Sequence, residues 1–200
     1  MNLAVIILGA GASSRMGQPK LLLPWRGSTV IGGIISQWRE LGAAQIAVVL
    51  RPDDDALKVE LDRLNFPSVA RIENPQPERG MFSSILCAAN WRGWRPEISH
   101  WAVALGDQPQ LKTETLQTLL EFSAQNPLAI CQPKAGGSGQ HPVILPAVAL
   151  AGVKTTSSSS LKEFLKLAGV PRVQCPVNDD GLSLDMDTPD DYKRLLSPDA

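Results

Sequence analysis

The chain has 200 residues, of which 44% are hydrophobic, enough to bury one well-packed core, and we expect a single domain over residues 1–200. Its 19 basic and 20 acidic residues are interspersed and give a formal net charge of −1. This balance argues against binding to nucleic acid or a membrane, because such proteins carry a basic stripe or tail. The first apolar segment is too short for a signal peptide or a membrane span, and three widely spaced cysteines indicate ordinary burial without metal or disulfide chemistry, so we expect a cytoplasmic protein.

The first expected element is a strand over Leu3–Leu8, which runs directly into a loop of small residues that contains Arg15 and Lys20. Small residues let backbone N–H groups approach a polyphosphate, and the two basic side chains add positive charge. We therefore interpret the loop as a nucleotide-binding segment. A P-loop does not fit, because Gly17 is not followed by Lys and Ser or Thr, and a Rossmann fingerprint would require glycine in place of Ser14. The residues expected to contact the nucleotide here are Leu8, Gly9, Ala10, Gly11, Ser13, Ser14, Arg15 and Lys20.

The following elements alternate between helix and strand. The apolar spacing predicts helices at about residues 29–41, 53–64 and 81–91, and strands at residues 46–50, 69–72 and 100–105. Buried strands separated by helices are typical of an α/β fold with three α/β/α layers and a mostly parallel, Rossmann-like sheet. Because ligands bind at the carboxyl ends of such strands, we expect the first loop and the Gly106–Pro109 segment to converge on one ligand.

The pattern changes in the last third of the chain. Two apolar segments, residues 128–132 and 142–145, flank a loop too short for a crossover helix, which predicts a short antiparallel excursion. The serines at 157–160 precede a helical pattern that begins at Leu161, and a last strand and helix are expected between about Val173 and Leu196. We expect about residues 1–125 to bind the nucleotide and about residues 126–200 to bind the acceptor.

Acidic residues follow two of the expected strands. Asp107 comes directly after a buried strand, where a carboxylate needs a cation or solvent as partner, and a magnesium ion suits one or two carboxylates together with phosphate oxygens. Asp107 could instead cap the next helix, but Thr113 is better placed for that. A second carboxylate is offered by Asp185 or Asp187, which share one side if the last strand continues through them. Of these two we favour Asp185 as the second metal ligand.

The first loop resembles the signature of the MobA-like nucleotidyltransferases of molybdenum cofactor biosynthesis, Leu-x-Ala-Gly-x-Ser-x-Arg-Met-Gly-x-x-Lys. The residues from Lys20 to Trp25 and the Gly106–Pro109 segment are more similar to the cytidylyltransferase branch. Ala10 also matches that branch, where the guanylyltransferases carry glycine. The resemblance implies an Mg²⁺-dependent transfer of CMP from CTP, or of GMP from GTP, to the phosphate of molybdopterin with release of pyrophosphate. A molybdoenzyme that receives the product is the partner it suggests.

The same resemblance implies roles for individual residues. It assigns catalysis to Arg15, Lys20 and Asp107, and metal binding to Asp107 with Asp185 or Asp187. It assigns contacts with the base and ribose to Asn74, Gly80 and Ser83, and contacts with the acceptor to Gln140 and His141, next to the glycine-rich residues 136–139. The chain departs from the family pattern at Gly9, at Gln140 in place of a glycine without the preceding arginine, and at Asp190 in place of a glutamate.

Three other interpretations remain open. A guanylyltransferase of the same architecture would use the same loops, and a nucleotidyltransferase for a sugar 1-phosphate or another small phosphate would share the first loop. A nucleotide-binding module without catalysis is the third, and the presence of Lys20, Asp107 and Asp185 together counts against it.

Overall fold

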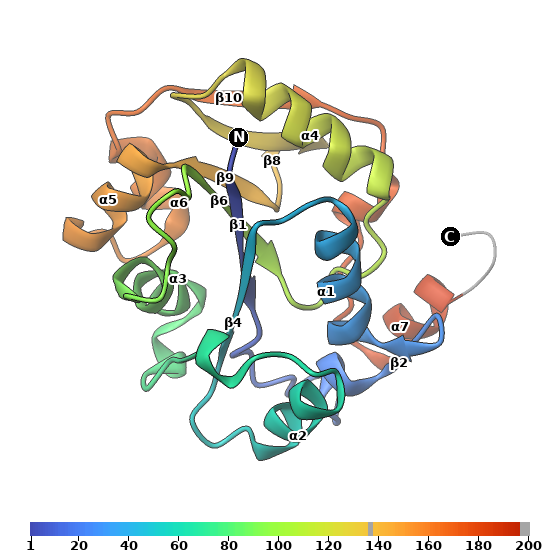
Figure 1. Ribbon diagram of the computed structural model, residues 1–200. Coiled ribbons are helices and arrows are strands. Elements are labelled where there is room, and N and C mark those ends of the chain that lie inside the picture. The colour runs from blue at the N-terminus through green and yellow to red at the C-terminus, as the bar shows by residue number, and fades with distance from the viewer. Residues whose placement is uncertain (136–137, 197–200) are drawn as a thin grey trace.

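The computed structural model describes residues 1–135 and 138–196 and has a three-layer α/β/α fold (Figure 1). Within this part of the chain the main sheet has the strand order β10-β7-β9-β6-β1-β4-β5, with β8 paired to β7, and β2 and β3 form a separate small hairpin. The strands of the main sheet are β1 (Leu3–Leu8), β4 (Gln45–Leu50), β5 (Arg71–Glu73), β6 (His100–Leu105), β7 (Ile130–Ala135), β8 (Ser138–Gly139), β9 (Val143–Pro146) and β10 (Arg172–Pro176). The hairpin consists of β2 (Pro24–Trp25) and β3 (Ser28–Thr29).

Helices cover both faces of the sheet. On one face, α3 (Met81–Asn90), α5 (Ala147–Thr155) and α6 (Leu161–Leu167) bury apolar side chains against β1, β4 and β6. On the other face lie α1 (Val30–Glu40), α2 (Asp55–Arg63), α4 (Thr113–Gln125) and α7 (Pro189–Leu196). Figure 1 shows α3, α5 and α6 on one side and α1, α4 and α7 on the opposite side. The chain also contains short 3₁₀ turns, η1 (Lys20–Leu22), η2 (Ser68–Ala70), η3 (Pro77–Arg79) and η4 (Asp180–Ser183).

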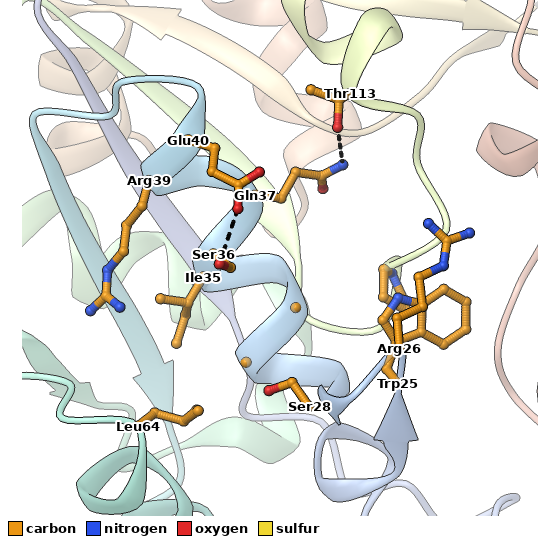
Figure 2. A pocket seen from close by; sticks show the side chains of 13 residues that line it. Trp25, Arg26, Ser28, Ile35, Ser36, Gln37, Arg39, Glu40, Leu64 and Thr113 are labelled. Atoms are coloured by element: carbon orange, nitrogen blue, oxygen red, sulfur yellow. Dashed lines mark hydrogen bonds between the residues drawn. The ribbon is translucent and has the colours of Figure 1, made fainter.

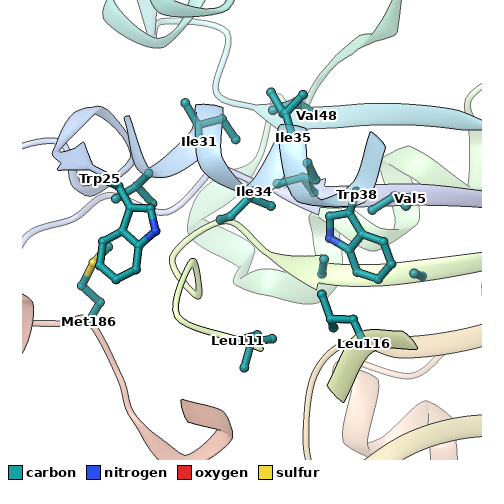
Figure 3. Close-up of a cluster of buried hydrophobic side chains, with 14 of the residues drawn as sticks. Val5, Trp25, Ile31, Ile34, Ile35, Trp38, Val48, Leu111, Leu116 and Met186 are labelled. Carbon is teal, nitrogen blue, oxygen red and sulfur yellow. The ribbon is translucent and has the colours of Figure 1, made fainter. Parts of the chain in front are cut away.

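The apolar stripe of α1 packs on the centre of the sheet. Its buried residues recur at the spacing of one helical face, so that they point together toward Val5 and Val48 (Figure 3). The buried face of α1 consists of Val30, Ile31, Ile34, Ile35 and Trp38. The helix begins after Thr29, whose hydroxyl accepts a hydrogen bond from the Gly32 N–H at 3.2 Å and so satisfies one of the free donors of the first turn.

The carboxyl ends of the central strands β1, β4 and β6 lie side by side at one edge of the sheet. β1 pairs in parallel with both β4 and β6, with Leu8 opposite Val49 and Leu105. The Gly106 N–H donates to the Leu8 carbonyl at 3.0 Å, and a Cβ on Gly106 would lie 2.6 Å from that same oxygen. Only glycine fits this approach, which brings the segments that follow β1 and β6 side by side.

The predicted antiparallel excursion is confirmed, because β9 pairs antiparallel with both β6 and β7. Three parts of the structure were not predicted from the sequence: the β2–β3 hairpin, the short strand β8 and helix α5. The strand expected at residues 69–72 forms only at Arg71–Glu73, after a 3₁₀ turn. Helix α4 starts at Thr113 with Lys112 as its N-cap, so Thr113 does not cap it. None of the helices within residues 1–135 and 138–196 is long and apolar enough to cross a membrane.

The last strand is shorter than expected. β10 ends at Pro176, and the buried Asp179 then turns the chain by accepting hydrogen bonds from the Gly181 N–H and the Lys112 N–H, both at 3.0 Å. No strand therefore passes through Asp185 and Asp187. The condition on which a shared side of Asp185 and Asp187 depended is therefore not met.

Candidate active site

A cavity of about 610 Å³ opens at the carboxyl ends of β1 and β6. Its walls come from the loop after β1, from the start of α3 and from the segment before α7, which lie far apart in the sequence. The expected convergence of the first loop with the segment after β6 is therefore present. The lining residues include Leu8, Gly9, Ala10, Gly11, Ser13, Ser14, Arg15, Lys20, Gly80, Asp107 and Asp187.

A cluster of two cations and two carboxylates lies in this cavity. The Lys20 ammonium is 3.1 Å from Asp107 Oδ2 and 2.6 Å from Asp187 Oδ1. Asp187 Oδ2 lies 2.6 Å from the guanidinium of Arg15, whose side chain is 70% exposed. The Lys20 side chain is only 11% exposed, so it is the better shielded of the two cations. The structure thus brings together Arg15, Lys20 and Asp107, the residues to which the resemblance assigns catalysis.

The contacts in this cluster favour the charged forms of its members. Burial lowers the pKa of Lys20, but the hydrogen bond to Asp187 and the charge of Asp107 outweigh it, so the pKa lies above its usual value. The hydrogen bond from Lys20 holds the pKa of Asp187 below its usual range against the opposing effect of burial. The charges of Lys20 and Arg15 lower it further.

Asp187 reaches the cavity because both of its neighbours are fixed. Met186 is 1% exposed and lies against Trp25 in the hydrophobic core (Figure 3). On the other side, Asp191 Oδ2 accepts hydrogen bonds from the Thr188 N–H at 2.8 Å, the Thr188 hydroxyl at 2.7 Å and the Asp187 N–H at 3.3 Å. These bonds, the Thr188 hydroxyl contributing most, and the hydrogen bond from Arg194 together lower the pKa of Asp191 to about 2.

Asp185 lies elsewhere. It is exposed and is not among the residues that line the cavity, although we favoured it over Asp187 from the sequence. Asp187, and not Asp185, therefore shares the Lys20 ammonium with Asp107.

The loop after β1 is held in a compact form. Ser13 adopts a φ of 49°, in the left-handed region that non-glycine residues rarely occupy. Its hydroxyl accepts a hydrogen bond from the Lys20 N–H at 3.3 Å, and its carbonyl accepts one from the Met16 N–H at 3.1 Å. Gly11 has free space where a side chain would be. The loop therefore leaves open backbone on the cavity side and is linked directly to the start of η1 at Lys20.

Asn74 and Ser83 lie behind the cavity wall. The Asn74 amide donates to the hydroxyls of Ser83 and Ser84 at 2.8 and 2.9 Å, and its oxygen accepts from the Gln76 N–H at 2.9 Å. Asn74 is 1% exposed, and neither Asn74 nor Ser83 lines the cavity, whereas Gly80 and Ser84 do. In this structure Asn74 and Ser83 shape the loop before α3, and their contact with a nucleotide stays a prediction.

Arg51 also lines the cavity, although no motif in the sequence points to it. Its position directly after the carboxyl end of β4 is the feature by which it could have been found. Its guanidinium pairs with Asp53 at 3.0 Å.

His141 lies two residues before the start of β9. Its Nδ1 is 3.2 Å from the Val103 carbonyl, which only accepts, so Nδ1 carries the proton, and Nε2 forms no hydrogen bond with the residues that the structure describes. Burial lowers the pKa of His141, although the hydrogen bond with Val103 and the charge of Asp107 oppose the shift, so the ring is neutral at physiological pH. The Gln140 N–H donates to the Pro133 carbonyl at 2.9 Å. Neither Gln140 nor His141 lines the cavity, and residues 136–137 of the adjoining loop lie outside the described residues.

A second cavity, of about 400 Å³, lies over the outer face of α1 (Figure 2). Gln37 in its wall donates to the Leu111 carbonyl at 2.8 Å, and the Arg26 guanidinium lies 5.3 Å from the centre of the Trp25 ring. None of the residues predicted for nucleotide, metal or acceptor binding lines this cavity.

The family follows from a comparison of the chain with known proteins. A family profile described as the MobA-like NTP transferase domain matches residues 5–175. The chain belongs to this family. The family assignment agrees with the resemblance carried by the loop after β1, and the mostly parallel sheet agrees with the predicted fold class.

Two curated relatives of this MobA-like protein match it over nearly their full length. The molybdenum cofactor cytidylyltransferase of Escherichia coli is 26% identical and covers 94% of this chain and 92% of its own. The nicotine blue oxidoreductase of Paenarthrobacter nicotinovorans is 29% identical and covers 96% and 95%. Among solved structures, Rv0371c from Mycobacterium tuberculosis has a TM-score of 0.74 at 28% identity, covering 98% and 97%. Relatives whose names state different activities therefore match nearly the whole of this chain.

The carboxylates of this MobA-like site fit a hard divalent cation. Within the part of the chain that the structure describes there is no group of three or more His, Cys, Asp or Glu side chains that could hold a metal alone. Two carboxylates that already converge on one cation match the way Mg²⁺ binds, since it completes its shell with phosphate oxygens and water.

Proposed function

We propose that this MobA-like protein is a divalent-metal-dependent nucleotidyltransferase that transfers CMP from CTP to the phosphate of molybdopterin. The observation that carries this proposal is the convergence of Asp107 and Asp187 on the Lys20 ammonium, inside a cavity walled by the glycine-containing loop. CTP is favoured because Ala10 matches the cytidylyltransferase branch and because the chain is 26% identical to a molybdenum cofactor cytidylyltransferase over 94% of its length.

In this reaction an oxygen of the molybdopterin phosphate attacks the α-phosphorus of CTP. The bond from the α-phosphorus to the bridging oxygen breaks, and pyrophosphate leaves with that electron pair. Positioning and charge neutralisation supply most of the rate enhancement in such transfers, so no protein nucleophile is needed. Loop amides around Gly11, together with Arg15 and Lys20, would hold the triphosphate.

Asp107 and Asp187 would hold the divalent cation, which when bound neutralises charge that develops on the phosphate oxygens. The 3.1 Å and 2.6 Å contacts with Lys20 support this role, because they already orient one oxygen of each carboxylate toward a shared positive charge. Arg15 holds the second oxygen of Asp187 and so fixes the carboxylate plane.

The acceptor would lie on the β6–β9 side of Asp107, near Gln140 and His141. A neutral His141 can accept a hydrogen bond at Nε2 from a donor group of the acceptor, but it supplies no positive charge for the phosphate. We propose a nucleotide-binding part over about residues 1–125, an acceptor-binding part over about residues 126–200, and delivery of the product to a molybdoenzyme.

A redox reaction is the second candidate, because an oxidoreductase is 29% identical over 96% of this chain. Two carboxylates focused on one cation serve metal-assisted transfer at a phosphate, whereas electron or hydride transfer does not require them. The charge cluster therefore favours nucleotidyl transfer.

The test measures pyrophosphate release with each of the four nucleoside triphosphates, with and without molybdopterin, and with Mg²⁺ or a chelator. We expect release only with metal and molybdopterin, and fastest with CTP. Calorimetric titration adds the affinities: equal or tighter binding of GTP would reject the cytidylyltransferase assignment but not the nucleotidyltransferase assignment.

A further inference from the structure

The Lys20 ammonium lies between the carboxylates of Asp107 and Asp187. The Lys20 ammonium contacts one oxygen of Asp107 and one of Asp187, and its side chain is 11% exposed. A divalent cation bound by the same pair would need these oxygens and would stand beside the ammonium as a like charge. Lys20 and the metal therefore compete for one position.

The charges of the cluster are balanced without a metal. Arg15 and Lys20 carry two positive charges, and Asp107 and Asp187 carry two negative charges, within contacts of 2.6 to 3.1 Å. A free divalent cation would leave this cluster with an excess of two positive charges. A triphosphate would bring negative charge and would give Lys20 another partner, which would leave the carboxylates of Asp107 and Asp187 available to the metal.

We propose that Lys20 is the resident cation of the Asp107–Asp187 pair, that it excludes the free divalent cation, and that the metal enters only together with a nucleoside triphosphate. The inference rests on the proposed function, because it uses the metal and nucleotide sites assigned there. Lys20 lies where the loop after β1 meets η1, and its backbone N–H donates a hydrogen bond to the Ser13 hydroxyl. Its long, flexible side chain lets the ammonium move from the carboxylates to the phosphates while this backbone stays in place.

A purely structural role for Lys20 makes the opposite prediction. If the ammonium only organised the two carboxylates, its removal would leave them to repel each other, and metal binding would weaken or stay unchanged. If it occupies the position of the metal, its removal strengthens metal binding in the protein without nucleotide.

The experiment titrates Mn²⁺ into the full chain and follows free Mn²⁺ by electron paramagnetic resonance, with and without CTP. The variants are Lys20→Met and the matched control Lys58→Met, whose ammonium pairs with Glu73 at 3.1 Å and does not line the cavity. Without CTP, Lys20→Met is expected to bind Mn²⁺ about tenfold tighter than the unmodified protein, since a like charge has been removed from its immediate surroundings. The Mn²⁺ affinity of Lys58→Met should equal that of the unmodified protein. CTP should tighten Mn²⁺ binding in the unmodified protein and in Lys58→Met, but much less in Lys20→Met.

Equal or weaker Mn²⁺ binding by Lys20→Met, with Mn²⁺ still binding in the presence of CTP, overturns the inference and leaves the proposed function standing. If the unmodified protein binds no Mn²⁺ even with CTP, the metal site of the proposed function fails as well. Circular dichroism checks the fold of Lys20→Met. Should it not fold, Lys20→Gln replaces it, because it removes the positive charge but keeps a polar side chain between the two carboxylates, and the same inference then requires tighter Mn²⁺ binding without CTP than in the unmodified protein.

Discussion

Replacing Asp187 with asparagine removes one of the two carboxylates that contact Lys20 and leaves the shape of the side chain almost unchanged. A pair of unit charges about 4 Å apart interacts with roughly 4 kcal/mol at an effective dielectric constant of about 20, before desolvation is subtracted. Lys20 keeps Asp107 as a partner at 3.1 Å, and the pair with the exposed Arg15 is screened by solvent. We therefore expect Asp187→Asn to lower the free energy of unfolding by only about 1–2 kcal/mol.

The effect on catalysis should be larger. Loss of a group that stabilises charge in the transition state typically lowers kcat about 100-fold to 1,000-fold, so Asp187→Asn should fall in that range. Asp185→Asn is the matched control two residues away, and because Asp185 is exposed and outside the cavity its kcat should stay within about threefold of the unmodified protein. Steady-state pyrophosphate release and urea unfolding of both variants give the two quantities. Loss of activity in Asp185→Asn with normal activity in Asp187→Asn would refute the assignment of Asp187.

Four further predictions concern residues around the cluster. Asp191→Ala should lower kcat about 10-fold to 100-fold, because the carboxylate that positions Asp187 is gone, and weaker Mn²⁺ binding in the presence of CTP would distinguish this from a folding defect. Gly106→Ala should cost about 1–3 kcal/mol in urea unfolding, since the new methyl group meets the Leu8 carbonyl at 2.6 Å; unchanged stability would contradict this. The pKa of Asp187 is lower in the folded protein than its ordinary value of 3.8, so the charged carboxylate stabilises the fold at pH values above 3.8, and this stabilisation is lost as the pH falls through the pKa of the folded protein. On acidification below about pH 4, Asp187→Asn should therefore lose less stability than the unmodified protein. His141→Ala should raise the KM for molybdopterin and spare CTP affinity, and the reverse pattern would reject the division of the chain into nucleotide and acceptor parts.

The sequence predicts the central strands and the site between them well, because these features depend on local pattern. The continuous apolar runs at residues 3–8 and 100–105 form β1 and β6 at those bounds. Parallel pairing then brings the segments after Leu8 and Leu105 to one edge of the sheet, which is where Lys20 and Asp107 meet.

The rest depends on tertiary contacts that have no local signature. The choice of Asp187 over Asp185 depends on where β10 ends, and that is decided by the buried Asp179 and its bond to the distant Lys112. Likewise, the family resemblance assigns a nucleotide contact to Asn74, but only the contacts of Asn74 with Ser83 and Ser84 reveal that it is buried behind the cavity wall.

The central claim is that this cavity joins a nucleotide to an acceptor through the phosphorus next to the nucleoside. Incubation with CTP labelled at its α-phosphorus, Mg²⁺ and molybdopterin, followed by separation of the products, tests it most directly. The account predicts that the label moves to molybdopterin, that one pyrophosphate forms per transfer, and that Asp107→Asn and a chelator each suppress both. Absence of label in molybdopterin with CTP, and with GTP, ATP or UTP in its place, would contradict it.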